Sequence, residues 1–536
     1  MVGKKLFVTA AAGVLIAAAG TASAAANFDN DVAASIDSGL AWFDSAGCYS
    51  GSFSCGDATG LALLALLEKR PAADVAPAGY SGASAADQAR MRRTARHIID
   101  SVNTQGSTDF YAYRDGAYMM ALSVYMKSGG PDKDDGPTTE LDGAPLTLKQ
   151  TLDVVFDRTM ANQRKGLPDT AAPWPANNGY WCYTDSGCRD SSTTQLVVGG
   201  LASARTVYIA GTYADAARKA QLDAATVLAR DAYRRNGTAG GGCTATTPAN
   251  EKGHGYNAGS ANSIQQTASG LWIQLVGGSA LNWQDTQYYL RWLQNRYRYT
   301  DIGGGVSDGW SSRSYWYYLW SSFKGYQFLL DSKAVPAAGK IGVDDIGTLP
   351  PADAPACAVR QEHRDPATLP RVTLFGPDGA GYYSAETKRV YFDYAYTIMG
   401  YQCGDGYYNC NGAPGRWDSY AEQAYALLVL QRSVGGGCLD ADRDGICDAD
   451  DPSVPQPPDA PPTGGGFYCD RPNDGDSRID NRDLAAIVDL LGADLQPVAV
   501  TPATAWANYN GDSVISRADF DDCKKVFGGR LPKKPF

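Results

Sequence analysis

Residues 180–204 read YWCYTDSGCRDSSTTQLVVGGLASA: an aromatic turn, then an aspartate followed by two serines, and then an apolar run rich in small residues. An aspartate just before such a run is typical of a helix N-terminus, because its side chain accepts hydrogen bonds from the first free amides. We therefore predict a helix that begins near Asp190. Since this helix is apolar on nearly every side, it has to be buried all round.

The same order of turn, polar residue and apolar helix recurs along the chain. The other copies are residues 48–67, 110–125, 254–277, 315–330 and 416–430. Between them lie amphipathic stretches with one charged face, at residues 85–102, 148–163 and 214–235. The economical packing places six apolar helices inside a layer of amphipathic ones. The predicted fold class is therefore mainly α: an α/α toroid of about six helical hairpins, with small C-terminal calcium-binding modules.

Copies such as W-C-Y-T-(x)5-D-S-S-T-T-Q-(x)4-G-L-A-S-A resemble the repeats of the squalene cyclase and protein prenyltransferase (terpenoid cyclase) superfamily. The resemblance covers residues 27–434 and implies the toroid. It implies little about chemistry, because the same toroid serves cyclases, prenyltransferases, thioester domains and sugar-cleaving enzymes. Residues 335–384 match no copy, and their composition predicts an inserted loop or a small sheet.

The reactions of that superfamily are poorly represented in the sequence. Its terpenoid cyclases use D-x-D-D as a proton donor, and this string occurs at residues 132–135 and 448–451. We expect the first to be an exposed loop and the second to bind calcium, whereas a donor needs burial. The sequence has no G-C-G-E-Q thioester string and no Cys/His/Asp set for the zinc of prenyl transfer.

The N-terminus predicts export. Lys4 and Lys5 precede an apolar run over residues 6–19, and the small residues 22–24 suit signal peptidase, so residues 1–24 are a predicted signal peptide. The run is shorter than the roughly 20 residues that span a bilayer. We therefore expect a secreted protein that passes through the periplasm and has no membrane span. A net charge of −11 disfavours nucleic acid as a partner.

Twelve cysteines in an oxidising compartment predict disulfides. Short spacing favours the pairs Cys48–Cys55, Cys182–Cys188, Cys403–Cys410 and Cys438–Cys447, and Cys469 and Cys523 bracket the last module, which leaves Cys243 and Cys357 to pair with each other. Zinc is the alternative. It is disfavoured because the only three histidines lie far apart in the sequence.

The acidic segment at residues 438–452 contains alternating aspartates around Gly445 and resembles a thrombospondin type 3 repeat. Ca²⁺ takes six to eight oxygen ligands, and without a cation so many carboxylates would repel one another. The predicted ligands are Asp440, Asp442, Asp444, Asp448 and Asp450. The alternative is a flexible acidic linker. Residues 453–466 are rich in Pro and Gly and predict an extended tether.

Residues 467–530 contain two similar segments, DGDSRIDNRDL from Asp474 and NGDSVISRADF from Asn510, which resemble the paired EF-hand-like loops of dockerin modules. The predicted Ca²⁺ ligands are Asp470, Asp474, Asp476, Asp480, Asp483, Asn508, Asn510, Asp512, Ser516 and Asp519. The first loop departs from the pattern at Pro472. The resemblance implies a cohesin-like or cell-surface protein as a partner.

Polar residues stand at the starts of the six apolar segments: Asp57, Asp115, Asp190, Ser260, Ser312 and Asp418. Their commonest role is helix capping. They would nevertheless converge on one end of a toroid together with the aromatic turn residues. A cleft with aromatic platforms and spaced carboxylates is what sugar binding and glycoside cleavage require.

The candidate acid and base residues are accordingly Asp190, Asp418 and Glu422. The candidate substrate-binding residues are Tyr180, Trp181, Tyr256, Trp310, Tyr315, Trp316 and Trp417, with Tyr113 and Trp174 in the same turns. The competing interpretation is that most of these aromatics are packing core.

Three functions follow from these features. The leading hypothesis is a secreted calcium-binding toroid that binds an extracellular polymer such as a polysaccharide, and that cleaves it if the carboxylates act as a hydrolase or lyase pair. The second is a non-catalytic adhesion or assembly protein, in which the caps are only caps. The third, an exported terpenoid cyclase, is disfavoured because its apolar substrate lies in membranes inside the cell.

Overall fold

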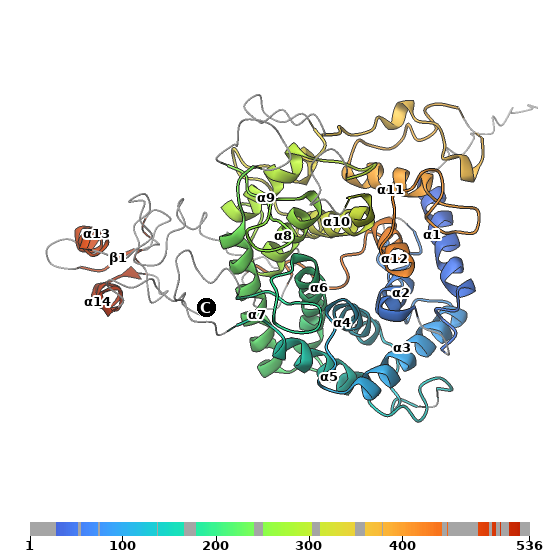
Figure 1. Ribbon diagram of the computed structural model, residues 1–536, viewed down its shortest axis with the longest axis horizontal. Coiled ribbons are helices and arrows are strands. Elements are labelled where there is room, and N and C mark those ends of the chain that lie inside the picture. Colours follow the sequence, from blue (N-terminus) through green and yellow to red (C-terminus); the bar gives the residue numbers. More distant parts are fainter. Residues whose placement is uncertain are drawn as a thin grey trace, which may run out of the picture.

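The computed structural model describes residues 28–51, 55–72, 75–136, 138–165, 178–240, 250–302, 311–348, 360–377, 379–441, 447–448, 481–491, 496–499, 504, 507 and 514–525. These residues are mainly helical (Figure 1). None of the helices among them is long and apolar enough to cross a bilayer. The predicted signal peptide and the Pro/Gly tether lie outside the described residues.

Six apolar helices form a closed ring. In chain order they are α2 (Thr59–Leu67), α4 (Ala112–Lys127), α6 (Ser191–Tyr208), α8 (Ile264–Val276), α10 (Tyr315–Asp331) and α12 (Ser419–Leu430). Each contacts the next, and α12 contacts α2, so the series closes on itself (Figure 1). Every residue of α2 is buried, as expected for a helix that is apolar all round. These six helices coincide with the six predicted repeat copies.

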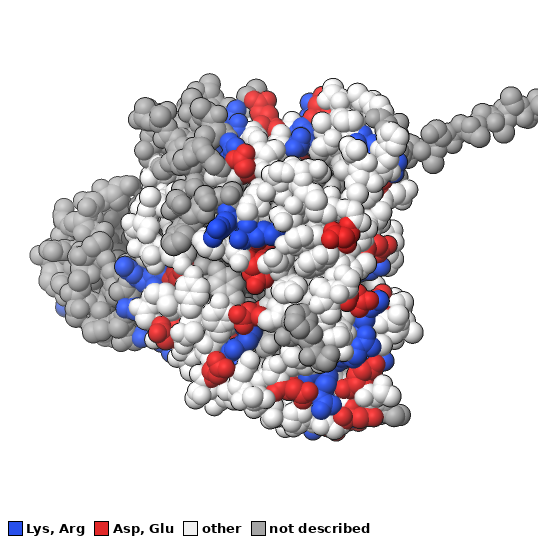
Figure 2. Space-filling view, turned by 45° about the vertical axis from the view of Figure 1, so that its right-hand side comes forward, with Lys and Arg blue, Asp and Glu red and all other residues white. Residues whose placement is uncertain are grey.

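A second set of helices packs outside the ring: α1 (Phe28–Ser45), α3 (Ala85–Gln105), α5 (Leu148–Ala161), α7 (Ala216–Asn236), α9 (Gln284–Asn295) and α11 (Val390–Gly400). In α3 the buried residues fall on one face, from Met91 to Val102. The predicted helices at 85–102, 148–163 and 214–235 are thus confirmed as α3, α5 and α7. Charged residues of both signs are interspersed over the face in Figure 2, consistent with a solvated outer layer.

Glycines let neighbouring inner helices approach closely. A Cβ atom on Gly116 of α4 would lie 2.4 Å from the carbonyl oxygen of Leu196 in α6, and one on Gly60 of α2 would lie 2.5 Å from the Ala117 backbone. Such distances exclude any side chain. Glycine therefore persists in these helices despite its unfavourable helix propensity.

The segment 335–384 is a loop, not a sheet, over its described residues. It contains the short 3-10 turns Val343–Asp345, Pro366–Thr368 and Thr373–Phe375. Gln287 of α9 holds it through two hydrogen bonds to the Ile341 backbone, both 2.8 Å long. His363 Nδ1 lies 2.6 Å from Asp393 Oδ2 of α11. The loop is thus fastened to α9 and α11 of the outer layer, and Arg371 also pairs with Asp31 of α1.

Four predicted disulfides are confirmed: Cys48–Cys55, Cys182–Cys188, Cys403–Cys410 and Cys438–Cys447. Cys523 is also disulfide-bonded. Cys243, Cys357 and Cys469 lie outside the described residues, so their predicted pairings stay predictions.

The end of the ring at which the inner helices finish is covered by the chain that follows α12. Gly435, Gly436 and Gly437 all have positive φ and pass within contact distance of α4 and α6 side chains. Ser203 of α6 donates a hydrogen bond to the Gly435 carbonyl. Arg205 then pairs with Asp440 at 2.6 Å. At the opposite end, where the helices begin, the described residues leave a cavity.

The described C-terminal residues form a small cluster of their own. Helix α13 (Asn481–Leu491) contacts α14 (Arg517–Lys525), and strand β1 (Val498–Ala499) pairs antiparallel with β2 (Val514–Ile515). Its apolar core includes Ile487, Leu491 and Ile515.

A lysine is buried in the middle of the ring. Lys324 of α10 is fully buried, and its Nζ lies 4.1 Å from the ring centre of Trp320 and 4.7 Å from that of Trp272. Nζ has no hydrogen-bond partner among the described residues. Desolvation lowers the pKa of this amine well below its ordinary value.

Replacing Lys324 with methionine is expected to raise the free energy of unfolding by about 1–3 kcal/mol at neutral pH, because the unsatisfied buried amine is removed. The unfolded chain holds a proton that the folded one releases, so wild-type stability rises with pH between the folded and unfolded pKa values. The variant should lose this slope in urea unfolding measured at several pH values. Lys69→Met, at a partly exposed lysine paired with Asp37, is the control. A less stable variant at every pH would mean that the indole faces stabilise the amine.

Candidate functional site

A cavity of about 400 Å³ opens at the end of the ring where the inner helices begin. Each of the six inner helices contributes a residue from its first turn: Leu61, Tyr113, Ser192, Gln266, Tyr317 and Ala421. The remaining lining residues are Asp57, Ala58, Tyr111, Tyr183, Tyr256, Ser314, Trp417, Asp418, Glu422 and Tyr425. The closure of the ring is therefore what creates the cavity.

Three tyrosines form one wall. The ring of Tyr113 stacks on that of Tyr183, with centroids 6.0 Å apart, and the hydroxyl oxygens of Tyr183 and Tyr256 lie 2.6 Å apart. Tyr113 donates a 2.8 Å hydrogen bond to Ser192 Oγ, which in turn donates to Asp190 Oδ1 at 2.6 Å. Burial raises the pKa of all three phenols, so they remain neutral hydroxyls. The wall is thus tied to the start of α6.

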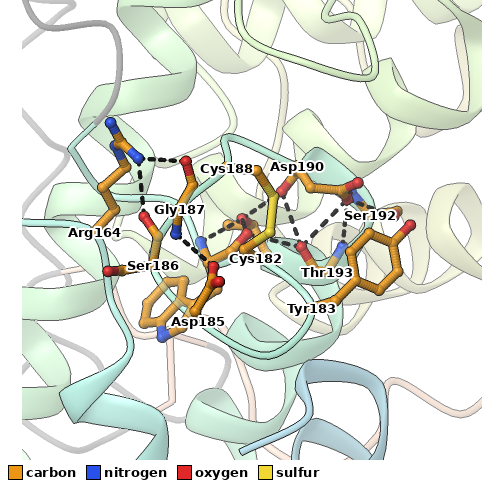
Figure 3. The surroundings of a disulfide bond; sticks show 12 residues. Arg164, Cys182, Tyr183, Asp185, Ser186, Gly187, Cys188, Asp190, Ser192 and Thr193 are labelled. Atoms are coloured by element: carbon orange, nitrogen blue, oxygen red, sulfur yellow. Dashed lines mark hydrogen bonds between the residues drawn. A yellow bond between two sulfur atoms is a disulfide. The ribbon is translucent and has the colours of Figure 1, made fainter.

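The disulfide Cys182–Cys188 holds the loop that carries Tyr183 (Figure 3). Inside this loop the Gly187 amide donates to Asp185 Oδ1 at 2.6 Å, and Arg164 donates to two of the loop's carbonyls. The carbonyl of Tyr183 accepts a 2.8 Å hydrogen bond from Ala112, the first residue of α4. These contacts position the Tyr183 side chain over the cavity.

The other wall belongs to α12 and the turn before it. Trp417 is 52% exposed, and its Nε1 donates to Ser314 Oγ at 3.2 Å. Asp418 caps α12 by accepting hydrogen bonds from the amides of Tyr420 and Ala421. Trp417 therefore presents an aromatic surface at the rim, and a carboxylate stands beside it.

Glu422 is the buried acid of the cavity. Its side chain is almost fully buried, and Oε1 accepts a 2.9 Å hydrogen bond from the Trp417 amide. Oε2 has no hydrogen-bond partner among the described residues. Burial raises the pKa of Glu422 to about 8, although the Trp417 amide and Arg416 act in the opposite direction. At neutral pH this side chain is therefore a protonated acid that can donate a proton.

Asp57 adds a third carboxyl group at the rim. It lies in the 3-10 turn Gly56–Ala58 that leads into α2. Desolvation raises the pKa of Asp57. The neighbouring charges of Asp418 and Asp115 raise this pKa further, whereas Arg114 lowers it. The effect of Asp418 on Asp57 shows that these two carboxyl groups, which precede α12 and α2, lie near each other at the cavity.

Apart from Asp190, the predicted site residues divide into three groups. Asp418, Glu422, Tyr256 and Trp417 line the cavity, and their roles as acid, base or substrate-binding residues stay predictions. Tyr180, Trp181, Tyr315 and Trp316 are fully buried in the core, so their prediction as substrate platforms is wrong. Trp310 and Trp174 lie outside the described residues.

Asp190 belongs to none of these groups, because it lies behind the tyrosine wall. It is buried, and Oδ1 accepts hydrogen bonds from the amides of Ser192 and Thr193, so it is the cap of α6. It does not line the cavity, and its predicted role as an acid or base stays a prediction.

Capping itself is confirmed for only part of the predicted set. Asp190 and Asp418 are caps. Asp115 instead lies inside the first turn of α4 and pairs with Arg158, and Ser260 accepts a hydrogen bond from Asn257 in the loop before α8. Asp57 precedes the Ala58 cap position of α2, and Ser312 lies within the 3-10 turn Ser311–Ser314. These four residues therefore lie within about one turn of the observed helix starts, but not at the cap positions.

Several cavity residues were not singled out by sequence: Tyr111, Tyr183, Tyr317, Tyr425, Ser192 and Gln266. One local pattern could have revealed Tyr425. Asp418, Glu422 and Tyr425 follow one another at helical spacings of four and three, which places them on one face of α12. Tyr183 has no such pattern, because it lies in a turn.

The predicted calcium ligands are only partly within the described residues. Asp440 pairs with Arg205, and Asp448 accepts a 2.8 Å hydrogen bond from the Ala441 amide. Ser516 precedes α14. Nothing is described for the side chains of the other proposed ligands, and no cluster of three acidic, histidine or cysteine residues that could hold a metal occurs in the described parts.

The first D-x-D-D string is less exposed than predicted. Asp132 is buried, and its two carboxylate oxygens accept hydrogen bonds from the amides of Lys133 and Leu148. Asp132 does not line the cavity. Its role is to hold the loop that leads into α5.

No family model, curated protein or solved structure matches the chain, so the function of the protein has to be inferred from the cavity itself.

Proposed function

We propose that this chain is a secreted α/α toroid that binds a polysaccharide in the cavity at the end of the ring where the inner helices begin and cleaves it with Glu422 as the proton donor. The observation that carries the proposal is the buried, protonated Glu422, whose Oε2 has no described partner, in a cavity lined with tyrosine and tryptophan. The cavity thus combines an acid that stays neutral at physiological pH with aromatic surfaces suited to sugar rings.

The aromatic residues support sugar binding. A pyranose ring packs its apolar C–H face on an aromatic side chain, while its hydroxyls form hydrogen bonds with neighbouring polar groups. Trp417 offers the exposed face, and the hydroxyls of Tyr183 and Tyr256 offer donors and acceptors. Because Trp417 lies at the rim, a polymer can extend beyond the cavity on that side.

The carboxyl groups support cleavage. In the proposed step Glu422 gives its proton to the glycosidic oxygen as the bond to the anomeric carbon breaks. Water adds to that carbon and gives its own proton to a second carboxylate, for which Asp57 and Asp418 are the candidates. The products are two shorter sugar chains, and the protons return to their starting distribution through solvent.

The C-terminal modules complete the proposal. We propose that residues 438–452 and 467–530 bind Ca²⁺ through the aspartate patterns described above. Supporting this, Ile515 of the second predicted loop is buried and paired with Val498, as a structured loop rather than a free tail requires. The last module would then attach the toroid to a cohesin-like or cell-surface protein.

A second candidate function is adhesion or assembly without catalysis. It is favoured by the capping roles of Asp190 and Asp418, which give both aspartates a structural purpose. If this candidate is right, removal of Ca²⁺ by a chelator abolishes adhesion or assembly, whereas loss of the Glu422 proton leaves adhesion or assembly unchanged. Binding of a glycan without release of reducing ends would select this candidate.

Binding and release of reducing ends from a panel of polysaccharides test the leading proposal. Trp417→Ala is expected to weaken binding about tenfold, because it removes the exposed stacking surface. Leu374→Ala, at an exposed residue of the 335–384 loop, is the control and should bind like the wild type. No binding and no release across the panel would refute the proposal.

A further inference from the structure

The cavity carries an unbalanced charge. Its described lining includes three carboxyl groups, those of Asp57, Asp418 and Glu422, and no lysine or arginine. Three guanidinium groups act on these carboxyl groups from outside the lining, Arg114 on Asp57 and Arg313 and Arg416 on Glu422. Each also has another contact: Arg114 pairs with Asp115 at 2.9 Å, Arg313 lies over the ring of Trp417 at 5.1 Å, and Arg416 lies over that of Trp316 at 4.5 Å.

Aromatic rings surround these carboxyl groups. Besides burial, Asp57 and Asp418 raise the pKa of Tyr111, and Asp418 also acts on Tyr425, which lies near Glu422 as well, so all of these residues lie around one space. The face of an aromatic ring carries partial negative charge and attracts cations. The aromatic rings and the carboxylates therefore both favour a cationic ligand.

Glu422 provides a second, independent indication of a ligand. It is 2% exposed, it lines the cavity, and its Oε2 has no hydrogen-bond partner among the described residues. Buried polar atoms are nearly always satisfied in a protein's working state. A polar group of a bound molecule would supply the missing partner.

We propose that the cavity selects sugar units bearing a free, protonated amine, so that its ligand is an amino-sugar polymer rather than a neutral or acidic glycan. The ammonium group binds between Asp57 and Asp418, against the aromatic faces. In this position of the sugar ring, the glycosidic oxygen lies beside Glu422. This inference rests on the proposed function, because it names the class of polysaccharide that the same cavity binds. An acidic glycan would be repelled by the same carboxylates.

The test compares three oligosaccharide probes of equal length by calorimetry with the full-length chain at mildly acidic pH: a glucosamine oligomer, its fully N-acetylated counterpart and a galacturonic acid oligomer. The glucosamine oligomer is expected to bind about tenfold more tightly than the acetylated one, and the acidic oligomer most weakly. Added salt should reduce the preference, because it screens the carboxylates.

Asparagine variants assign the preference to named residues. Asp418→Asn keeps a good helix cap while removing the charge. Asp57→Asn removes the charge in the 3-10 turn before α2, where the side chain caps no helix. Each is expected to bring the affinity ratio of the cationic and acetylated oligomers toward one. Asp405→Asn, at an exposed aspartate outside the cavity lining, is the matched control and should retain the ratio.

The outcomes separate this inference from the function on which it rests. Equal or tighter binding of the acetylated or acidic oligomer overturns the amine selectivity and leaves polysaccharide binding in place. A preference that persists in both asparagine variants overturns the assignment to Asp57 and Asp418. Failure of every oligomer and every polysaccharide to bind overturns both proposals.

Discussion

Replacing Glu422 with glutamine is expected to lower kcat for glycan cleavage by about 10² to 10⁴-fold, the usual contribution of a general acid. Glutamine has the shape of the protonated acid and can still accept the Trp417 amide hydrogen bond, but it has no proton to give. The rate of reducing-end release at saturating polysaccharide measures the effect. The fold should be intact, because the substitution leaves the packing around the side chain unchanged.

The pH dependence follows from the raised pKa of Glu422. Only the protonated form donates, so wild-type activity should fall as the pH rises through about 8. Stability changes in the same direction. The folded state holds the proton that the unfolded state has released, so Glu422's contribution is complete below the unfolded pKa and is lost as the pH passes about 8. Glu422→Gln should therefore be more stable than the wild type at higher pH.

Glu68 offers a matched control for this experiment. It is also a buried glutamate, and burial raises its pKa to about 7, but it follows the C-terminus of α2, away from the cavity. Glu68→Gln should alter the pH dependence of stability and leave kcat unchanged. A Glu422→Gln protein that retains wild-type kcat would show that Glu422 is not the acid and would favour the assembly hypothesis.

Replacing Asp115 with leucine is expected to lower the free energy of unfolding by about 3–5 kcal/mol, because it leaves Arg158 buried without its counter-charge. Both side chains are fully buried, and Arg158 contacts the two carboxylate oxygens at 2.5 and 2.7 Å. Arg158 also donates to the Gly106 carbonyl beyond the end of α3. The pair thus joins α4, α5 and the α3 terminus.

Urea unfolding monitored by circular dichroism measures this loss. The double variant Asp115→Leu with Arg158→Met should recover part of it, because neither charge then remains buried alone. Arg96→Met removes a much more exposed ion pair with Asp100 and should cost less than about 1 kcal/mol. If Asp115→Leu costs no more than this control, the buried pair contributes little to the stability of the ring.

Much of the helical plan was predictable from local pattern. Helices that are apolar all round, such as α2 and α6, differ from one-faced helices such as α3 in periodicity alone, and periodicity is a property of the chain. The short disulfides were predictable for a similar reason, because cysteines six to nine residues apart need little loop closure. The helices α1, α9 and α11 have weaker patterns and were not singled out.

The site was predictable only in part. Asp418, Glu422 and Trp417 stand at the start of one helix, so the prediction of that helix brought them together. Asp190 stands at the equivalent place on α6, yet Ser192 and Tyr113 separate it from the cavity. Asp190 and Asp418 differ in their access to the cavity because the turns before α4 and α6 pack against each other. This packing cannot be predicted from the sequence of either segment alone.

The amino-acid sequence by itself determined which helices are buried, in what order they alternate and which short disulfides fasten their turns, because apolar periodicity and loop length act within each segment. The tertiary structure alone decided which side chains line the cavity. Tyr180 and Tyr183 lie three residues apart in one turn, but Tyr180 is fully buried and Tyr183 is 37% exposed at the cavity. Burial of a turn residue depends on neighbours contributed by distant helices, and only the closure of the ring brings those neighbours together.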